Sequence, residues 1–287
     1  MKAAVDIGSN TVQMLAGIVQ NGQVVPHYTF LATTRLGAFE APGLLSQKSI
    51  LATVAALQEI KALLEAAGVH EVYPVATSAV REAKNKAELL DRVKEACHWQ
   101  IDVLSGDQEA ALTFLGAQSL VQGEDCLMMD VGGGSSEIIV KKGMQLESVS
   151  IDIGAVRAKE ESWDRQEIKA RLQKESVLSI KGQAALKAVG IGGSFTSSAA
   201  VLLDLSEYSR EAVHGLNCNY DQLEELWQKI HPLSDRERCA FSPLLAQRGE
   251  IIAQGLEIIL SLMELFSIQE VLVSDAGILD GVLLKKD

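Results

Sequence analysis

Two glycine-rich segments, each beginning with an aspartate, have the residue types that bind phosphate. They are DIGSNT at residues 6 to 11 and DVGGGSSE at residues 130 to 137. Glycine lets the backbone come close to an anion, and successive backbone N–H groups can form a concave anion-binding nest. The expected phosphate-binding residues of the two segments are Gly8, Ser9, Asn10, Thr11, Gly132, Gly133, Gly134, Ser135 and Ser136.

Acidic residues flank these glycines and could hold a divalent cation. Asp130 and Glu137 offer hard oxygen ligands, and Asp6 repeats the position of Asp130. Taken singly, the second segment could be a glycine-rich hairpin turn and the first an ordinary turn capped by Asp6. The occurrence of two such segments in one chain favours phosphate binding, with Mg²⁺ or another divalent cation at Asp130, Glu137 and Asp6.

A third glycine cluster contains Gly190, Gly192 and Gly193, followed by Ser194 and Thr196. It lies where a predicted strand meets the start of a helix, a position that suits phosphate or nucleoside contact. A tight junction between strand and helix is the alternative. By contrast, the segment 152–154 (DIG) imitates the Asp6 loop without its Ser and Gly donors, and we interpret it as a strand end.

Glu109 and Arg81 are candidates whose role the local pattern leaves open. Ser105 followed by Gln108 resembles a capping box, and a glutamate in the first turn of a helix gains from the helix dipole, so the local pattern alone favours capping for Glu109. Arg81 could clamp phosphate oxygens through a bidentate fork, with Thr77 and Ser78 nearby, or could simply be solvated. Secondary candidates, whose stems could equally pack, are Arg35 and Arg248.

The elements that would position the first set of residues alternate between strand and helix. Residues 2–7 and 12–19 read as strands, with a hairpin turn at Asn21-Gly22. Apolar residues recur at spacings of three and four between residues 46 and 68, which predicts an amphipathic helix. The following expected elements are a strand at 71–76, a helix through 78–97, a strand at 100–104 and a helix at 106–121. This alternation indicates an α/β class.

The second half of the chain repeats the opening arrangement. A strand at 125–130 leads into the glycine segment, and a hairpin turns near Lys142-Gly143. Helical stretches at 164–188 and 219–230, a strand with a glycine turn at 186–194, a helix at 247–266, a strand at 269–273 and a last short helix follow.

The spacing of the two aspartates indicates a duplicated fold. Asp6 and Asp130 are 130 − 6 = 124 residues apart, about the length of one domain. We therefore expect two related lobes, 1–119 and 120–287, with the boundary near residues 117–122 and the last helix able to pack back on the first lobe.

Composition excludes several functional classes. The chain has 287 residues and a net charge of −12, which opposes non-specific binding to nucleic acid or to anionic lipid. Its four cysteines form no CxxC pair and its five histidines show no zinc-like spacing. No apolar run reaches the roughly 18 residues of a membrane span, and the start turns polar too early for a signal peptide. We expect a cytoplasmic protein with neither nucleic acid nor membrane as a partner.

Several segments in order resemble the exopolyphosphatase/guanosine pentaphosphate phosphatase (Ppx/GppA) family of the actin/Hsp70/sugar-kinase superfamily. They are DIGSNTVQM (6–14), TRLG (34–37), ATSAVREAKN (76–85), LSGDQEA (104–110), DVGGGSSEI (130–138), GIGGSFTS (190–197), VHG (213–215) and VSDAGILDG (273–281). The resemblance covers essentially the whole chain. It implies two lobes of the actin-like (ribonuclease H-like) fold with a cleft between them, and a homodimer.

The resemblance also implies roles for individual residues. It makes Glu109 the catalytic carboxylate that orients and deprotonates the attacking water, and it assigns Arg81 to phosphate. Two positions depart from the family pattern: Gln13 stands where many members carry a basic residue, and Leu279 replaces an arginine of the final glycine motif. Both changes remove positive charge, which leaves the choice of substrate open.

The implied activity is hydrolysis of the terminal phosphoanhydride of inorganic polyphosphate, assisted by Mg²⁺. One alternative is a guanosine pentaphosphate 5′-phosphohydrolase, which uses the same chemistry. A kinase of the same superfamily would share both loops, but Glu109 in its LSGDQEA context argues against it. A non-catalytic polyphosphate or nucleotide sensor is supported only by the departures at Gln13 and Leu279.

Overall fold

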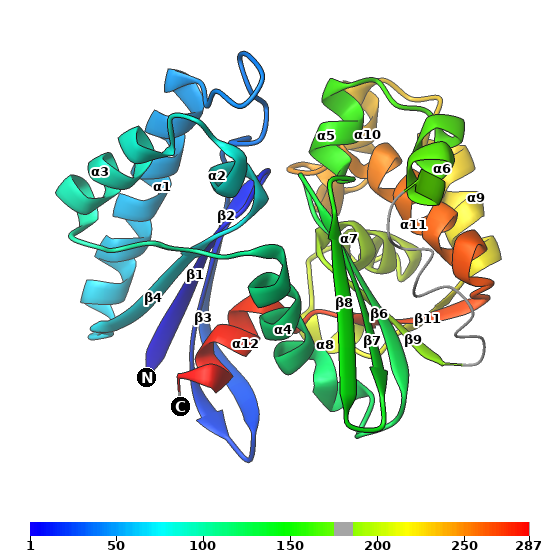
Figure 1. The fold of residues 1–287 in the computed structure, drawn as a ribbon, viewed down its shortest axis with the longest axis horizontal. Helices are drawn as coiled ribbons and strands as arrows, with labels where there is room; N and C mark the ends of the chain where they lie inside the picture. The colour runs from blue at the N-terminus through cyan, green and yellow to red at the C-terminus, as the bar shows by residue number, and fades with distance from the viewer. Residues whose placement is uncertain (175–185, 287) are drawn as a thin grey trace. The chain divides into compact units, whose positions relative to one another are not determined.

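The computed structural model describes residues 1–174 and 186–286, and these residues form two compact units (Figure 1). The first unit contains residues 1–116 together with 278–287, and the second contains residues 117–277. The division falls three residues before the expected boundary at 119/120. The last ten residues, which the expected second lobe included, belong to the first unit.

The first unit is built on a five-stranded sheet with the order β3-β2-β1-β4-β5. Its strands are β1 (Lys2–Ile7), β2 (Thr11–Gln20), β3 (Gln23–Thr33), β4 (Glu71–Ala76) and β5 (Asp102–Val103). Strand β2 runs antiparallel to both β1 and β3, while β4 and β5 run parallel to β1. Asn21 and Gly22 join β2 to β3 with φ of 53° and 74°, which confirms the predicted hairpin turn.

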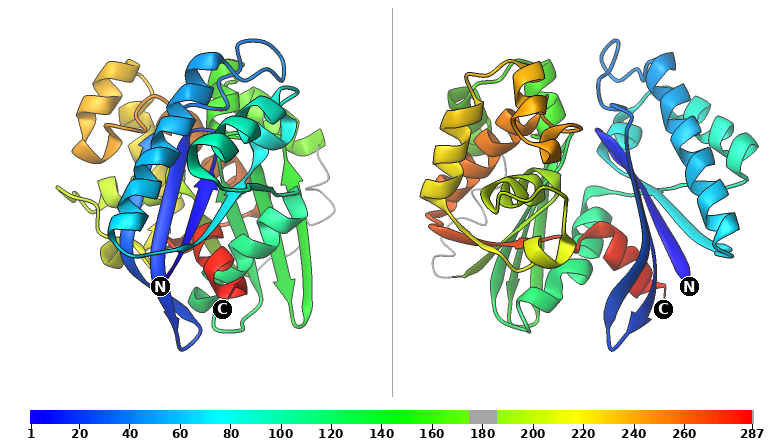
Figure 2. Two further views of the ribbon diagram at one scale, coloured as in Figure 1. Left: turned by 90° about the vertical axis from the view of Figure 1, so that its left-hand side faces the viewer. Right: turned by 180° about the vertical axis from the view of Figure 1, so that it is seen from behind.

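Helices pack on both faces of this sheet because β1 is apolar on both sides. They are α1 (Gln47–Ala66), α2 (Ser78–Glu82), α3 (Lys86–Cys97), α4 (Gly106–Ala117) and α12 (Ile278–Lys285). Ala3 and Val5 belong to a core formed with α1 and α3, whereas Ala4 packs with Leu112 of α4 and Val282 of α12. Figure 2 shows α12 (red) beside the first strands (blue).

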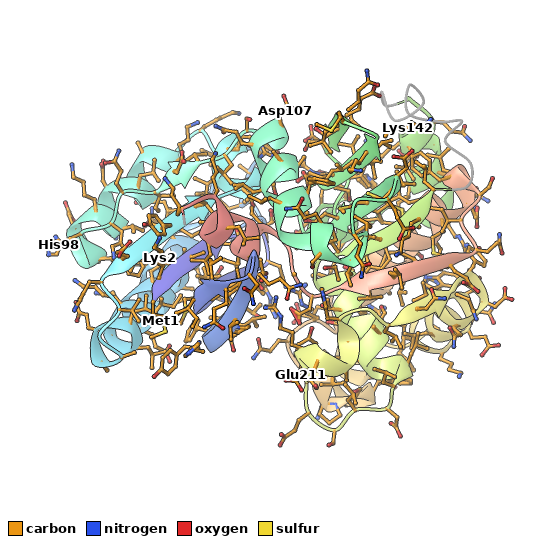
Figure 3. All side chains as sticks on the ribbon, turned by 90° about the horizontal axis from the view of Figure 1, so that it is seen from below. Met1, Lys2, His98, Asp107, Lys142 and Glu211 are labelled. Atoms are coloured by element: carbon orange, nitrogen blue, oxygen red, sulfur yellow. The ribbon has the colours of Figure 1, made fainter. Side chains whose placement is uncertain are left out.

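The two ends of the chain meet in the first unit. The Lys2 ammonium donates to the Lys286 carbonyl oxygen at 2.7 Å, and Lys2 is labelled in Figure 3. The backbone of α12 also approaches α4 closely, since a Cβ at Gly281 would lie 1.9 Å from the Leu112 carbonyl oxygen. Glycine at this position therefore lets α12 close the sheet face.

Three predictions for the first unit were wrong in detail. The helix expected through 78–97 is broken at residues 83–85 into α2 and α3. The strand expected at 100–104 has only two residues, 102 and 103. The helix expected to reach residue 121 ends at Ala117, and a 3₁₀ turn, η1 (Gln118–Leu120), follows.

The second unit is built on a six-stranded sheet with the order β10-β11-β9-β6-β7-β8. Its strands are β6 (Cys126–Val131), β7 (Ser136–Lys142), β8 (Gln145–Ile151), β9 (Lys187–Ile191), β10 (Asn217–Asn219) and β11 (Glu270–Ser274). As in the first unit, three successive antiparallel strands are followed by strands parallel to the first of them, here β9 and β11, while the short β10 runs antiparallel to β11. The hairpin predicted at 142–143 is confirmed, with Lys142 paired to Gln145.

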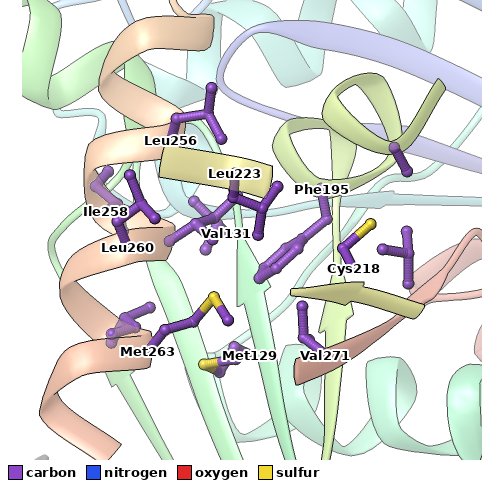
Figure 4. Close-up of a cluster of buried hydrophobic side chains, with 14 of the residues drawn as sticks. Met129, Val131, Phe195, Cys218, Leu223, Leu256, Ile258, Leu260, Met263 and Val271 are labelled. Atoms are coloured by element: carbon purple, nitrogen blue, oxygen red, sulfur yellow. The ribbon is translucent and has the colours of Figure 1, made fainter. Parts of the chain in front are cut away.

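Eight helical segments belong to the described part of the second unit. They are α5 (Ala155–Glu160), α6 (Arg165–Lys174), α7 (Gly193–Leu202), α8 (Arg210–Val213), α9 (Tyr220–Ile230), α10 (Asp235–Phe241), η3 (Pro243–Leu245) and α11 (Ile252–Phe266). The core lies between the sheet and α7 and α11, where Met129, Phe195, Leu256 and Met263 pack together (Figure 4). A Cβ at Gly190 would lie 2.3 Å from the Phe195 ring, so this glycine of the third cluster serves packing.

The helix predictions for this unit needed two corrections. The helix expected at 164–188 covers α6, but 175–185 lie outside the described residues and Lys187 begins strand β9. The helix expected from residue 247 begins at Ile252, after η3 and a turn. The helix expected at 219–230 is confirmed as α9. No helix in residues 1–174 or 186–286 is long and apolar enough to cross a membrane.

Candidate active site

The first glycine loop is a tight turn between β1 and β2. The Gly8 N–H donates to the Thr11 carbonyl oxygen at 3.0 Å, so this amide closes the turn. The side chains of Ser9, Asn10 and Thr11 are all buried. Within the described residues, the buried Asn10 Nδ2 has no hydrogen-bond acceptor. A buried amide donor without a partner is costly, and an anion bound at the loop would satisfy it.

The segment after β3 supports this loop from behind. The N–H groups of Thr34 and Arg35 donate to the Asn10 carbonyl oxygen at 3.0 and 2.9 Å, and the Gly37 N–H donates to the Ser9 carbonyl oxygen at 2.7 Å. Arg35 adopts a φ of 53°, an uncommon conformation for a residue other than glycine. Because these carbonyl groups face the 34–37 segment, that segment fixes the orientation of the loop peptides.

Glu109 is held by Arg81 rather than by the cap of its own helix. Arg81 Nη1 donates to Glu109 Oε2 at 2.8 Å and to the Leu104 carbonyl oxygen at 3.0 Å. Ser105 and Gln108 form the predicted capping box between themselves, with distances of 3.2 and 2.8 Å. Glu109 is only 8% exposed. The capping role that the local pattern favoured for Glu109 is therefore taken by Gln108.

The predicted residues of the first unit meet at one edge of its sheet. Ile7 pairs with Ala76, and Ala76 pairs with Val103, so the ends of three parallel strands lie side by side. These ends carry the first loop, Thr77 with Ser78, and the segment that leads to Glu109. The Ser78 hydroxyl donates to Glu82 Oε1 at 2.7 Å, so it is engaged within its own helix.

The second glycine loop joins β6 to β7 with the same turn. The Gly132 N–H donates to the Ser135 carbonyl oxygen at 3.1 Å. The Ser136 hydroxyl donates to the Ile153 carbonyl oxygen at 2.6 Å, so it holds the loop to the chain behind it. The Ser135 hydroxyl donates to Glu137 Oε1 at 3.0 Å. The serine hydroxyls predicted to bind phosphate thus have partners within the protein.

The start of α5 supports the second loop. The N–H groups of Ala155 and Val156 donate to the carbonyl oxygens of Gly132 and Gly133 at 2.9 and 2.8 Å. Arg157 Nε donates to the Gly134 carbonyl oxygen at 2.9 Å. With their carbonyl groups turned toward α5, the peptides of the loop present N–H groups on the other side, as an anion nest requires.

Gly154 is needed for this close contact. A Cβ at Gly154 would lie 2.4 Å from the Gly133 carbonyl oxygen. The segment 152–154 was predicted to be a strand end, and β8 does end at Ile151. The sequence did not indicate that this segment lies against the loop, because it has no side-chain donors there. Its glycine instead leaves room for the backbone of the loop.

Asp130 and Glu137 are direct cross-strand partners. They stand opposite each other in the antiparallel pairing of β6 with β7, so their carboxylates share one face of the sheet. Glu137 is 1% exposed. Two like charges at opposed positions repel, and a bound cation would relieve that repulsion. No group of three or more His, Cys, Asp or Glu side chains suited to a metal occurs in the part of the chain that the structure describes.

The third glycine cluster lies against the second loop. Gly192 has a φ of 90°, and a Cβ there would lie 2.6 Å from Asp130 Oδ1. A Cβ at Gly193 would lie 1.9 Å from Arg248 Cζ, so the guanidinium of Arg248 packs directly over this glycine. Ser194 is buried beneath Gly255 of α11. The cluster therefore brings Arg248 to the neighbourhood of Asp130.

Within the described residues, no acidic side chain forms an ion pair with the guanidinium of Arg248. Across residues 1–174 and 186–286 its guanidinium makes no hydrogen bond or ion pair, and desolvation by burial lowers its pKa. Arginine nevertheless stays charged at neutral pH. An uncompensated guanidinium beside a glycine loop is suited to an anion, which raises Arg248 above the secondary status that the sequence supported.

Two other segments of the family pattern meet beyond β11. The Asp275 N–H donates to His214 Nδ1 at 3.3 Å, and burial lowers the pKa of His214. The Tyr208 hydroxyl donates to Asp275 Oδ2 at 2.6 Å. His214 accepts a hydrogen bond through a neutral ring, so it fixes the loop after β11 in position.

Comparison with known proteins gives consistent relatives. The model of the Ppx/GppA phosphatase family matches residues 31–287. Exopolyphosphatase 2 of Mycobacterium tuberculosis is 27% identical, with 98% of this chain and 97% of that protein covered. Exopolyphosphatase 1 of the same organism is 26% identical over 98% of this chain and 86% of its own length.

Solved structures agree with these relatives. The Ppx/GppA family member from Aquifex aeolicus is 29% identical with a TM-score of 0.80, covering 99% of this chain and 96% of that one. An exopolyphosphatase from Cytophaga hutchinsonii, at 23% identity, shares the fold with a TM-score of 0.89 over 99% and 96% of the two chains. The match of the family model over most of the chain shows that this protein belongs to the Ppx/GppA phosphatase family.

Proposed function

We propose that this chain hydrolyses the terminal phosphoanhydride bond of inorganic polyphosphate and releases phosphate. The observation that carries the proposal is the ion pair of Glu109 with Arg81 at the sheet edge that also bears the first glycine loop. The arginine keeps this nearly buried carboxylate ionised and oriented, as a group that positions water and accepts its proton must be. Relatives named exopolyphosphatases support polyphosphate as the substrate class.

In the proposed reaction, Glu109 orients a water molecule toward the terminal phosphorus and takes one of its protons. The water oxygen forms a bond to phosphorus while the bond from phosphorus to the bridging oxygen breaks. The shortened chain leaves with that electron pair on its new terminal oxygen. Positioning and neutralisation of charge account for most catalysis of phosphoryl transfer, so no covalent nucleophile is required.

Each unit offers its own groups that could neutralise charge on phosphate oxygens. The first contributes the side chains of its loop and Arg81, and the second contributes loop N–H groups and Arg248. The opposed pair Asp130 and Glu137 fits a divalent cation such as Mg²⁺. Proteins commonly bind Mg²⁺ through one or two carboxylates together with substrate phosphates. When bound, such a cation would stabilise negative charge that develops on phosphate oxygens.

The test is phosphate release by the purified chain from polyphosphate, guanosine pentaphosphate and ATP, each with Mg²⁺ and with excess chelator. We expect release from polyphosphate with Mg²⁺, little from ATP, and loss of release with chelator. Faster release of phosphate from guanosine pentaphosphate than from polyphosphate would make the nucleotide the substrate, with the same hydrolysis of a terminal phosphoanhydride. Tight binding of polyphosphate with no release from any substrate would contradict the proposal and favour a sensor.

A further inference from the structure

Ser150 is a residue of β8 that no motif in the sequence indicated. Its hydroxyl donates to Glu137 Oε1 at 2.8 Å. It stands opposite Glu137 in the pairing of β7 with β8, so Asp130, Glu137 and Ser150 form one row across three strands. We propose that Ser150 is a positioning residue that orients Glu137 as a cation ligand, an inference that rests on the proposed function.

Two hydroxyl groups donate to the same oxygen of Glu137. The Ser135 hydroxyl donates to Oε1 at 3.0 Å from the loop side, and the Ser150 hydroxyl donates from the neighbouring strand. Two donors on one oxygen fix the rotation of the carboxylate about its terminal bond, a torsion that is otherwise broad. Hydrogen-bonded partners of this kind orient the ligands of metal sites and tune their affinity.

The equivalent row of the first unit gives an internal comparison. There Asp6 faces Gln13, and Gln13 faces Leu31. The row with two acids contains the hydroxyl of Ser150. The row with one acid has the apolar side chain of Leu31 at the equivalent position. This pattern links Ser150 to the second acid rather than to a general need of the strand.

A purely structural role makes a different prediction from a positioning role. If Ser150 only satisfied a buried carboxylate, its loss would lower the stability of the fold without a specific effect on cation affinity. Ser148 separates the two cases. It lies two residues away on the same face of β8, and within the described residues its side chain makes no hydrogen bond.

The experiment is a titration of the full chain with Mn²⁺ alone. Electron paramagnetic resonance measures the concentration of free Mn²⁺ at each point, which gives the affinity. The variants are Ser150→Ala, Ser150→Thr, which keeps the hydroxyl, and the control Ser148→Ala. Loss of a partner of a metal ligand typically weakens affinity by roughly 10- to 100-fold. We expect that loss for Ser150→Ala, with Ser150→Thr and Ser148→Ala close to wild type.

Phosphate release supplies a second readout. For Ser150→Ala the Mg²⁺ concentration at half-maximal rate should rise by a similar factor, while kcat at saturating Mg²⁺ stays near the wild-type value. Circular dichroism checks that each variant is folded.

The outcomes distinguish this inference from the function on which it rests. Equal Mn²⁺ affinity of Ser150→Ala and wild type would overturn the role of Ser150 and leave the hydrolase standing. Equal weakening by Ser148→Ala would also overturn it, because the effect would belong to the strand. A wild-type chain that binds no Mn²⁺ would overturn the cation site itself.

Discussion

The two units have the same loop in the same register but different residues opposite the aspartate. Asp6 faces Gln13, and Asp130 faces Glu137. Both aspartates are seven residues before their partners, and Gly8 and Gly132 close equivalent turns. An acid opposite an amide creates no need for a cation, whereas an acid opposite an acid does. We therefore propose the second unit as the site of the cation, while the prediction of Asp6 as a further ligand stays a prediction.

The segments that follow the third strand also correspond. In each unit the backbone N–H groups of this segment donate hydrogen bonds to carbonyl groups of the loop. The donors are Thr34, Arg35 and Gly37 in the first unit and the start of α5 in the second. The first loop keeps the side chains of Ser9 and Asn10 at the positions where the second has Gly133 and Gly134. One loop therefore offers side-chain donors, and the other offers a backbone that an anion can approach closely.

Replacement of Glu137 by Gln should have the largest effect, because it gives the second row the acid–amide pair of the first row. Loss of a ligand should exceed the roughly 10- to 100-fold cost of losing a ligand's partner, so we expect Mn²⁺ affinity to fall by more than about 100-fold. The matched control is Gln13→Ala, which alters the first row and should leave Mn²⁺ affinity unchanged. Equal losses of Mn²⁺ affinity in Glu137→Gln and Gln13→Ala would contradict a cation site in the second row alone.

Replacement of Gly154 by Ala tests the support of the second loop. The new Cβ would lie 2.4 Å from the Gly133 carbonyl oxygen, so loop and helix must separate. Overpacking of this kind typically costs about 1–3 kcal/mol in the free energy of unfolding. We expect a lower urea midpoint and a higher KM for polyphosphate. At Gly37 the nearest atom is Ser9 Cβ at 2.8 Å, and Gly37→Ala should cost less. The reverse order would contradict the assignment of α5 as the tighter support.

Replacement of Gln13 by Glu should have the smallest effect. It places a second acid opposite Asp6 without a hydroxyl equivalent to Ser150, since Leu31 occupies that position. Like charges at opposed positions destabilise a sheet by about 0.2–1 kcal/mol. Urea unfolding should show this loss, and Gln13→Arg should show a gain through attraction to Asp6. A stabilised Gln13→Glu variant with a new Mn²⁺ site would show that the first row also accepts a cation.

Features that depend on neighbouring residues could be predicted from the sequence. The hairpins at 21–22 and 142–143 were indicated by their turn residues, and the cap of α4 by Ser105 and Gln108. The position of Ser150 also follows from the second hairpin, because its turn fixes every pair along β7 and β8. The signal for this row lies in the register of the hairpin, which pairs Lys142 with Gln145 and Glu137 with Ser150, and not in a local motif.

Features that depend on tertiary packing could not be predicted from local patterns. The pair of Arg81 and Glu109 joins residues 28 positions apart, and its geometry depends on how α2 and α4 pack at the sheet edge. The contact of Arg248 with Gly193 likewise depends on the chain between η3 and α11. Helix α5 has six residues, too few for an apolar repeat to reveal it.

In the proposed reaction Glu109 of the first unit is the base, and replacement of Glu109 by Gln tests this most directly. The matched control is Asp107→Asn, which removes an exposed acid from the same first turn of α4. Loss of a general base typically costs roughly 10² to 10⁴ in rate. We predict that loss in kcat for phosphate release by Glu109→Gln, with Mn²⁺ affinity retained and Asp107→Asn close to wild type. Near-normal turnover by Glu109→Gln, or an equal loss in Asp107→Asn, would contradict the account.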